Sequence, residues 1–141
     1  MKTLLSLFLS MFFLMPLFAE EGLGELDGTG LVCEVSDKKY ERDEDLKYFV
    51  FERGEVHWFF ITDGTQLKIS KVSHGRYIAS PTDVRWYPYI LDRKTLRLDK
   101  LRPTYPSRQH KCQVMAPKQI QTILQEQIEA LKDTTKKDND I

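Results

Sequence analysis

The sequence predicts a mainly β domain: a small antiparallel sheet or barrel of about seven to nine strands with one C-terminal amphipathic helix. Three observations support this fold class. Short runs rich in aromatic and β-branched residues recur between turn signals from residue 31 to residue 115. Cysteines at both ends of that region can join its first strand to its last. After residue 116 the apolar residues recur with helical spacing instead.

Residues 1–19 are predicted to be a secretory signal peptide. Lys2 precedes an apolar run from Leu4 to Phe18, and Ala19 then precedes two glutamates. The run is shorter than the ~20 residues that span a bilayer, so cleavage after Ala19 is favoured over an uncleaved membrane anchor. We therefore expect a periplasmic or secreted protein with no stable membrane span after cleavage.

Export would place the two cysteines in an oxidising compartment. In an oxidising compartment Cys33 and Cys112 are expected to form a disulfide. Closing a loop of about 80 residues stabilises a fold by about 4.5 kcal/mol on the chain-entropy account. A redox-active or metal-binding thiol is the alternative, although the chain has no CxxC spacing.

The N-terminal part of the mature chain is acidic and then strand-rich. Residues 20–30 are predicted to be a flexible acidic arm, because glycine and acidic residues alternate there. The β domain, residues 31–116, closed by the disulfide, begins with a strand at 31–35. A charge run at 37–45 is predicted to be a solvated loop.

A hairpin of two aromatic strands follows, at residues 47–52 and 56–61. Both faces of its second strand are apolar, so that strand is expected to lie centrally or in a closed barrel. One face carries Val56, Trp58 and Phe60, and the other carries His57, Phe59 and Ile61.

Turn signals separate the remaining strands. Ser73-His74-Gly75 is expected to turn the chain, and Pro88 restricts its strand to an edge or a bulge. Residues 92–95 look like a four-residue hairpin turn, and two prolines make 102–108 a loop. The strands are predicted at residues 66–72, 76–80, 84–89, 89–91, 96–98 and 110–115.

A helix is predicted over residues 117–132, because its apolar residues lie on one face. Pro117 suits the first turn. The helix is expected to pack on the open face or mouth of the sheet, and residues 133–141 are predicted to be a disordered tail. The apolar face consists of Ile120, Ile123, Leu124, Ile128 and Leu131.

No catalytic or metal-binding residues are predicted, and no cofactor. His57, His74 and His110 form no HxH or HExxH spacing, and the sequence has no GxSxG, Walker or GxGxxG motif. His57 is expected to be half-buried, and the other two histidines solvated. The chain is therefore predicted not to be an enzyme; a small hydrolase with a site that only the fold assembles is the alternative.

Charge is spread unevenly along a chain that is neutral overall, with 21 basic and 21 acidic residues. Residues 20–56 hold 12 acidic and five basic side chains, net −7, whereas residues 76–111 hold three acidic and nine basic, net +6. This asymmetry can mark a basic face for a polyanion, but mutual neutralisation of the two segments is favoured. Overall neutrality argues against a dedicated nucleic-acid binder.

Aromatic residues beside arginine suggest a binding patch. In the predicted strand 84–89, Val84 and Trp86 lie on one face and Arg85, Tyr87 and Tyr89 on the other. Arginine and tyrosine together are typical of protein-binding or sugar-binding surfaces. Coverage of this face by the helix at 117–132 is favoured over an exposed patch. The predicted patch consists of Arg76, Arg85, Tyr87, Tyr89 and Arg97.

The layout resembles that of small secreted two-cysteine bacterial proteins of unknown function, over residues 31–115. The resemblance implies no activity. It rests on Cys33-Glu34-Val35, Tyr77 with Val84-Arg85-Trp86, Leu91-Asp92-Arg93-Lys94-Thr95-Leu96-Arg97-Leu98, and Cys112-Gln113-Val114.

A second segment, Ser73-His74-Gly75-Arg76-Tyr77, is similar to the Ser-Gly-x-x-Tyr segment of the small β-barrel inhibitors of C-type lysozyme, with the glycine displaced by one position. Those inhibitors also bridge early and late cysteines. The likeness implies a partner-binding turn formed by Ser73, His74, Gly75 and Tyr77.

The sequence thus predicts an exported, non-enzymatic protein of the periplasm or envelope that acts as a binding module. An inhibitor of a lysozyme-type cell-wall hydrolase is the alternative function. The expected partner is an envelope protein or a lysozyme-type enzyme.

Overall fold

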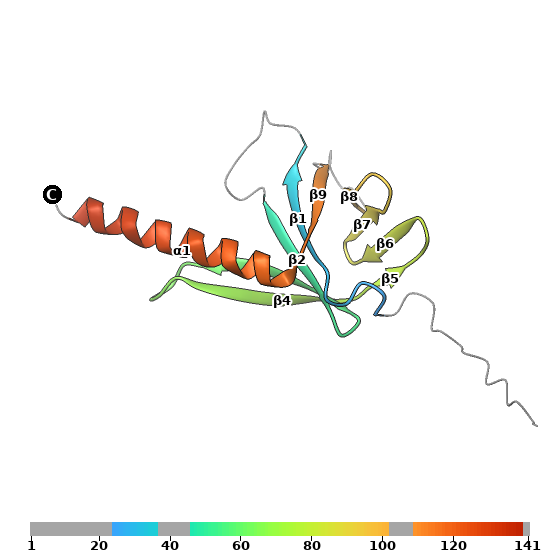
Figure 1. Ribbon diagram of the computed structural model, residues 1–141, viewed down its shortest axis with the longest axis horizontal. Coiled ribbons are helices and arrows are strands. Elements are labelled where there is room, and N and C mark those ends of the chain that lie inside the picture. The colour runs from blue at the N-terminus through green and yellow to red at the C-terminus, as the bar shows by residue number, and fades with distance from the viewer. Residues whose placement is uncertain (1–23, 37–45, 102–108, 140–141) are drawn as a thin grey trace, which may run out of the picture.

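The computed structural model describes residues 24–36, 46–101 and 109–139. It confirms a mainly β protein of nine antiparallel strands and one C-terminal helix (Figure 1). The elements are β1 (Gly30–Val35), β2 (Lys47–Glu52), β3 (Glu55–Thr62), β4 (Lys68–Arg76), β5 (Ile78–Ala79), β6 (Asp83–Trp86), β7 (Tyr89–Asp92), β8 (Arg97–Lys100), β9 (His110–Met115) and α1 (Pro117–Asn139).

The strands form one sheet that curls into a nearly closed barrel. Their order is β4-β3-β2-β1-β9-β8-β7-β6-β5, so the first and last strands are neighbours in the middle of the sheet. Contacts between the two ends of the sheet form a seam: His74 Nδ1 on β4 lies 3.4 Å from the carbonyl oxygen of Tyr87, just after β6. Tyr77, between β4 and β5, donates its backbone N–H to Gly54 O at 3.3 Å.

Two apolar cores lie on opposite sides of the sheet. In β2, Phe49 and Phe51 point into the barrel, whereas Tyr48 and Val50 point outward toward α1. In β3, Val56 and Trp58 belong to the barrel core, and Phe59 belongs to the core beneath the helix. Both faces of β3 carry core residues, but six of its eight residues are only partly buried and the strand lies next to the edge strand β4.

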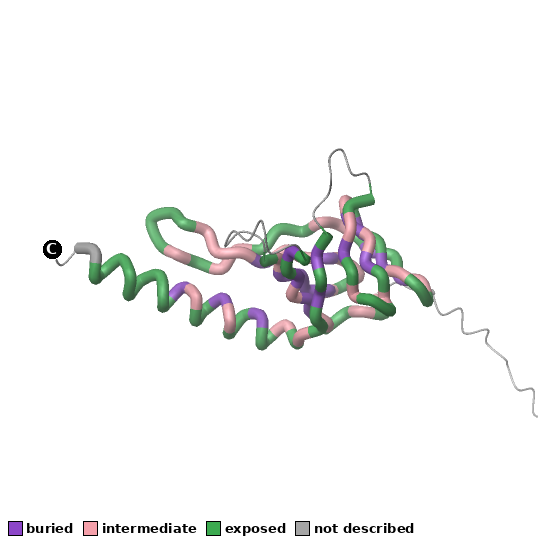
Figure 2. Tube along the Cα trace, turned by 90° about the horizontal axis from the view of Figure 1, so that it is seen from above, coloured by how far each residue is buried: buried purple, intermediate pink, exposed green. Residues whose placement is uncertain are grey.

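The helix buries only its N-terminal half. Ile120, Leu124 and Ile128 are buried, whereas Leu131 and the described side chains after it are exposed (Figure 2). The helix continues to Asn139, so the prediction that it ends at residue 132 is wrong, and the expected disordered tail is helical as far as that residue. Its close approach explains Gly30: a Cβ there would lie 2.5 Å from Ile120 Cδ1.

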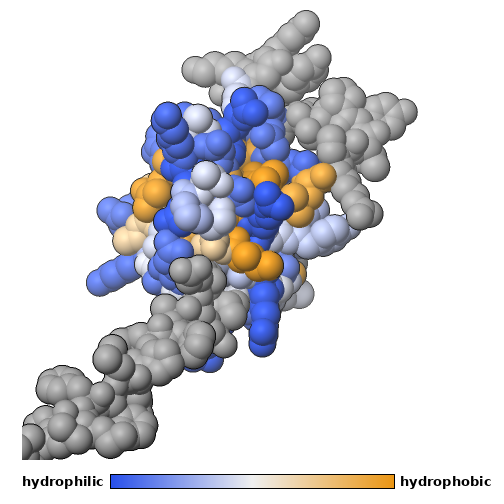
Figure 3. All heavy atoms as spheres, turned by 90° about the vertical axis from the view of Figure 1, so that its right-hand side faces the viewer, coloured by the Kyte–Doolittle hydropathy of each residue, from blue (hydrophilic) through white to orange (hydrophobic). Residues whose placement is uncertain are grey.

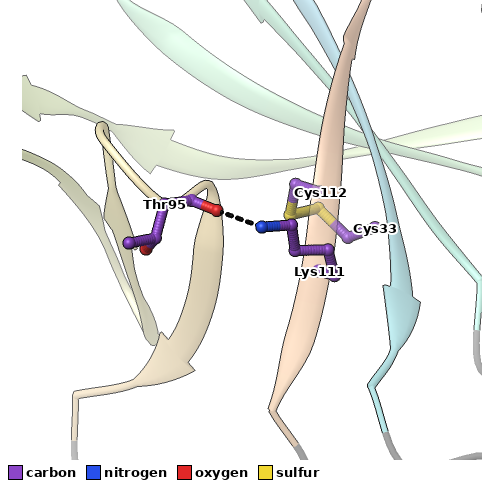
Figure 4. Close-up of a disulfide and its surroundings, with 4 residues drawn as sticks. All are labelled: Cys33, Thr95, Lys111 and Cys112. Carbon is purple, nitrogen blue, oxygen red and sulfur yellow. Dashed lines mark hydrogen bonds between the residues drawn. A yellow bond between two sulfur atoms is a disulfide. The ribbon is translucent and has the colours of Figure 1, made fainter.

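The Cys33–Cys112 disulfide is present, as predicted. The two residues face each other in the register of β1 and β9, and both are almost fully buried in the barrel core. Figure 4 shows Lys111 beside the bridge, donating through Nζ to the carbonyl oxygen of Thr95 at 2.6 Å. This bond ties β9 to the turn between β7 and β8.

The segment just before β1 is anchored, so the prediction of a flexible arm is wrong for residues 24–30. Asp27 accepts hydrogen bonds from Gly54 N at 3.0 Å and from the Tyr77 hydroxyl at 2.9 Å. The same hydroxyl accepts one from Leu26 N at 2.9 Å. Glu25 adds an ion pair with Arg93 at 2.8 Å. Long-range bonds of this kind leave no local pattern in the sequence.

Replacing Tyr77 with phenylalanine is expected to lower the free energy of unfolding by about 2 kcal/mol, because two hydrogen bonds are lost in a buried site. Burial, followed by the hydrogen bond to Asp27, raises the pKa of Tyr77 from 10.0 to about 12. The unfolded chain therefore releases this proton first as pH rises. The stabilisation is complete below pH ~10 and is lost between pH ~10 and ~12.

Urea unfolding at pH 8 and at pH 11 checks this prediction. The wild-type protein should lose more stability between the two pH values than Tyr77→Phe. Equal losses would mean that the Tyr77 hydroxyl does not contribute to the alkaline transition.

Two of the predicted strand boundaries are wrong. Residues 73–75 do not turn the chain, because β4 runs on through them to Arg76 and Gly75 absorbs an irregularity in register with φ +84°. Residues 84–89 do not form one strand, because the cis Tyr87–Pro88 bond lies in a tight turn between β6 and β7. Trp86 consequently pairs with Tyr89 across that turn.

Some predictions concern residues that are not described. The signal peptide at 1–19, the first part of the acidic arm, the charge run at 37–45, the loop at 102–108 and the last two residues lie outside the described ranges.

Candidate functional site

The arginines of the predicted patch are separated on the surface. Arg85 pairs with Asp83 at 2.8 Å, and Arg97 pairs with Asp99 at 3.2 Å. The hydrogen bond from Arg85 is the main cause that lowers the pKa of Asp83. These pairs lie on β6 and β8, with β7 between them, whereas Arg76 lies at the end of β4. Two of the three arginine charges are thus balanced locally.

The tyrosines of the patch have different fates. Tyr87 is 76% exposed, but Tyr89 is only 8% exposed and belongs to the barrel core, so its placement in a surface patch is wrong. The reason is the turn at Tyr87–Pro88, which reverses the chain before Tyr89. The predicted cover is also absent, since α1 packs on the β1–β4 part of the sheet. Figure 3 shows the β5 end of the molecule, where hydrophobic residues lie in separate groups among hydrophilic ones.

The predicted partner-binding turn is not a turn. Ser73, His74 and Gly75 belong to β4, and the Tyr77 side chain is fully buried. Ser73 Oγ donates to Glu55 Oε2 at 3.1 Å and accepts from Gly75 N at 3.0 Å. These residues therefore do not project from the molecule as a loop.

The structure instead groups five residues near Trp58, and we call this group the Trp58 strip. Trp58 stacks on Phe60 with 4.6 Å between ring centroids and 29° between ring planes. Val72 lies directly opposite Trp58 on β4, and the ring of His74 lies 6.1 Å from that of Trp58. Across the seam, His74 Nδ1 lies near the backbone carbonyl oxygen of Tyr87, whose side chain is exposed. The strip consists of Phe60, Trp58, Val72, His74 and Tyr87.

The alternation of side chains between the two faces of the sheet forms the strip. Successive residues of β3 point to opposite faces, so Trp58 and Phe60 share the face opposite α1. Val56, on the same face, is fully buried, but Trp58 and Phe60 are only half-buried. Val72 is 48% exposed. The strip thus begins in the core and ends at the surface.

Basic and aromatic groups surround the strip. Lys47 Nζ lies 5.8 Å from the centre of the Trp58 ring, within cation–π range. Within the strip, the His74 ring packs on two rings of the barrel core. Its centre lies 6.0 Å from that of Phe49 and 6.1 Å from that of Tyr89. Burial raises the pKa of Tyr89. Trp86 packs against the same rings, and its Nε1 has no hydrogen-bond partner among the described residues.

The histidines are not arranged as a catalytic site. His57 Nε2 lies 3.9 Å from Glu55 Oε2, beyond hydrogen-bond distance, and His74 faces a backbone carbonyl. His110 is 7% exposed, so its predicted solvation is wrong. Within residues 24–36, 46–101 and 109–139, no three histidine, cysteine, aspartate or glutamate side chains gather as a metal site would require.

Two surface grooves run beside α1. One lies between α1 and β4 and is lined mainly by polar residues, including Gln121, Gln125 and Glu129. No helix in the described part of the chain is long and apolar enough to cross a membrane.

Sequence reasoning found part of the strip and missed the rest. The alternation of residues 56–61 places Trp58 and Phe60 on one face, and Tyr87 is a member of the candidate patch. His74 was missed, because the predicted turn at residues 73–75 removed it from the strand that faces Trp58. Val72 lies in the predicted strand 66–72, but the sequence does not show that it pairs with Trp58.

Comparisons with known proteins identify no relative: no protein-family model, curated protein or solved structure matches this chain. The disulfide is compatible with an extracellular or periplasmic protein.

Proposed function

We propose that the protein is an exported, non-enzymatic binding module of the periplasm or cell envelope, released by cleavage after Ala19, and that it binds a partner through the Trp58 strip. The supporting observation is that Phe60, Trp58, Val72 and His74 lie together on the side of the sheet opposite α1 and are partly exposed. The exposed Tyr87 adjoins them through its backbone carbonyl oxygen. Aromatic side chains that are already partly shielded from water contribute much of the binding energy at protein interfaces. Lys47 adds a positive charge beside them.

The lysozyme-inhibitor alternative is not favoured by any contact. It needs a turn that enters an enzyme cleft, but residues 73–76 are strand and Tyr77 is buried. The hydrolase alternative needs a histidine hydrogen-bonded to a carboxylate, and neither His57 nor His74 has such a bond in the described chain.

The test is capture from the envelope fraction of the producing cell with purified mature protein. Val72→Asp and Tyr87→Ala are each expected to reduce the recovered partner at least about tenfold, because both change exposed strip residues. The native protein isolated from the same fraction should begin at Glu20, as its mass will report.

Val114→Asp is the matched control. Val114 is an exposed strand valine of β9, 62% exposed, outside the strip. It should retain the partner, and all three variants should unfold within about 0.5 kcal/mol of the wild-type protein. Undiminished capture by Val72→Asp, or an equal loss with Val114→Asp, would reject the strip as the binding surface.

A further inference from the structure

We propose that β4 is an open sheet edge that accepts an extended acidic peptide as an additional strand. This inference rests on the proposed function, because it assigns a partner chemistry to the edge beside the Trp58 strip. The positive charges of β4 favour an extended acidic segment of another protein as the added strand.

The sheet order leaves β4 at one end, with nine residues, whereas the other end is β5, with two. Contact across the seam is made near His74, in the second half of β4. Along the first half, Lys68 to Val72, no described strand pairs with the outer edge. An edge with unpaired backbone N–H and C=O groups is a template for another strand.

The charges of β4 determine which kind of strand can pair with its outer edge. β4 contains Lys68, Lys71 and Arg76 and no acidic residue. Lys71 has a partner, Glu52, at 3.6 Å, but Lys68 and Arg76 form no ion pair within the described chain. A second copy of β4 would bring lysine against lysine, which disfavours self-pairing, whereas an acidic strand would be attracted.

Side-chain alternation sets the pattern of the peptide. Ser70 and Val72 share the face of the Trp58 strip, whereas Ile69 and Lys71 face the opposite way. Residues of an added strand opposite Ser70 and Val72 would therefore lie beside the strip, and those opposite Lys71 beside a cation. The edge thus fits a segment in which apolar and acidic residues alternate.

The probe is a labelled eight-residue peptide of alternating valine and glutamate, measured by fluorescence anisotropy with the mature protein. The same peptide with lysine in place of glutamate should bind at least about tenfold more weakly, and the glutamate peptide should weaken as salt is raised. Lys71→Glu should weaken binding about tenfold. Lys94→Glu, an exposed lysine in the β7–β8 turn, is the matched control and should leave binding unchanged.

Two N-methylated peptides then test strand addition itself, each methylated on every second amide. One set of amides faces β4 and the other faces solvent, so one methylated peptide should lose binding at least about tenfold and the other should bind normally. Equal binding by both would show attachment by charge alone and would overturn the proposal.

The failure modes are distinguishable. If the glutamate peptide does not bind while Val72→Asp still loses the cellular partner, β4 is not a peptide edge but the proposed function stands. If Val72→Asp still captures the cellular partner, the proposed function fails. If Val72→Asp binds the glutamate peptide as well as the wild-type protein does, the peptide site at β4 is separate from the strip.

Discussion

Replacing Cys33 and Cys112 together with alanine is expected to lower the free energy of unfolding by about 4.5 kcal/mol. The bridge joins residues separated by 79 positions, and a cross-link over so long a loop removes much conformational entropy from the unfolded chain. The measurement is guanidinium unfolding of the double variant and of the oxidised wild-type protein, followed by circular dichroism. Small domains have total stabilities of about 5–15 kcal/mol, so the variant should be marginally folded.

The wild-type protein unfolded and refolded in excess reductant is the control, because it keeps both sulfur atoms but not their bond. It should be destabilised nearly as much as the double variant. A loss below about 1 kcal/mol in both would show that the packing of β1 against β9 alone sets the stability.

Truncating Leu124 to alanine is expected to cost about 2–5 kcal/mol, because the side chain is 1% exposed and packs in the core between α1 and the sheet. Leu131→Ala is the matched control on the same apolar face of the helix. Leu131 is 47% exposed, so its truncation should change stability by about 0.5 kcal/mol or less.

Urea unfolding of both variants provides the comparison. Losses of similar size would mean that the C-terminal half of α1 is packed as firmly as the first half, contrary to the burial pattern along the helix. A loss confined to Leu124→Ala would locate the docking energy of α1 in its first three turns.

Local patterns predicted much of the fold. Alternation and aromatic content located β2 and β3, and the change to helical spacing located the start of α1 at Pro117. The disulfide followed from the expected compartment and an even cysteine count. Each of these features can be read from a few neighbouring residues or, for the disulfide, from the two cysteines.

The errors arose where distant residues decide the local structure. Gly75 suggested a turn, but its positive φ is used inside a strand that β3 holds in register. Pro88 suggested a bulge, but the chain reverses there because Trp86 and Tyr89 pair with each other within the core. Residues 24–29 looked flexible, but Asp27 finds its partners at Gly54 and Tyr77.

The candidate site follows the same division. Strand alternation was sufficient to place Trp58 and Phe60 on one face. The exposure of Tyr87, the burial of Tyr89 and the contact of His74 across the seam all depend on how the sheet curls. Curvature of a nine-stranded sheet is a property of all its strands, and no segment of the sequence encodes it alone.

The adjacency of β1 and β9 also bears on biosynthesis. The strand that completes the middle of the sheet ends at Met115, so a nascent chain on the ribosome has nothing to pair with the second edge of β1 until almost the whole domain has been made. Pairings so distant along the chain are slow to form, because a long loop must close before any contact rewards it. The polypeptide therefore stays without its nearly closed barrel throughout most of translation.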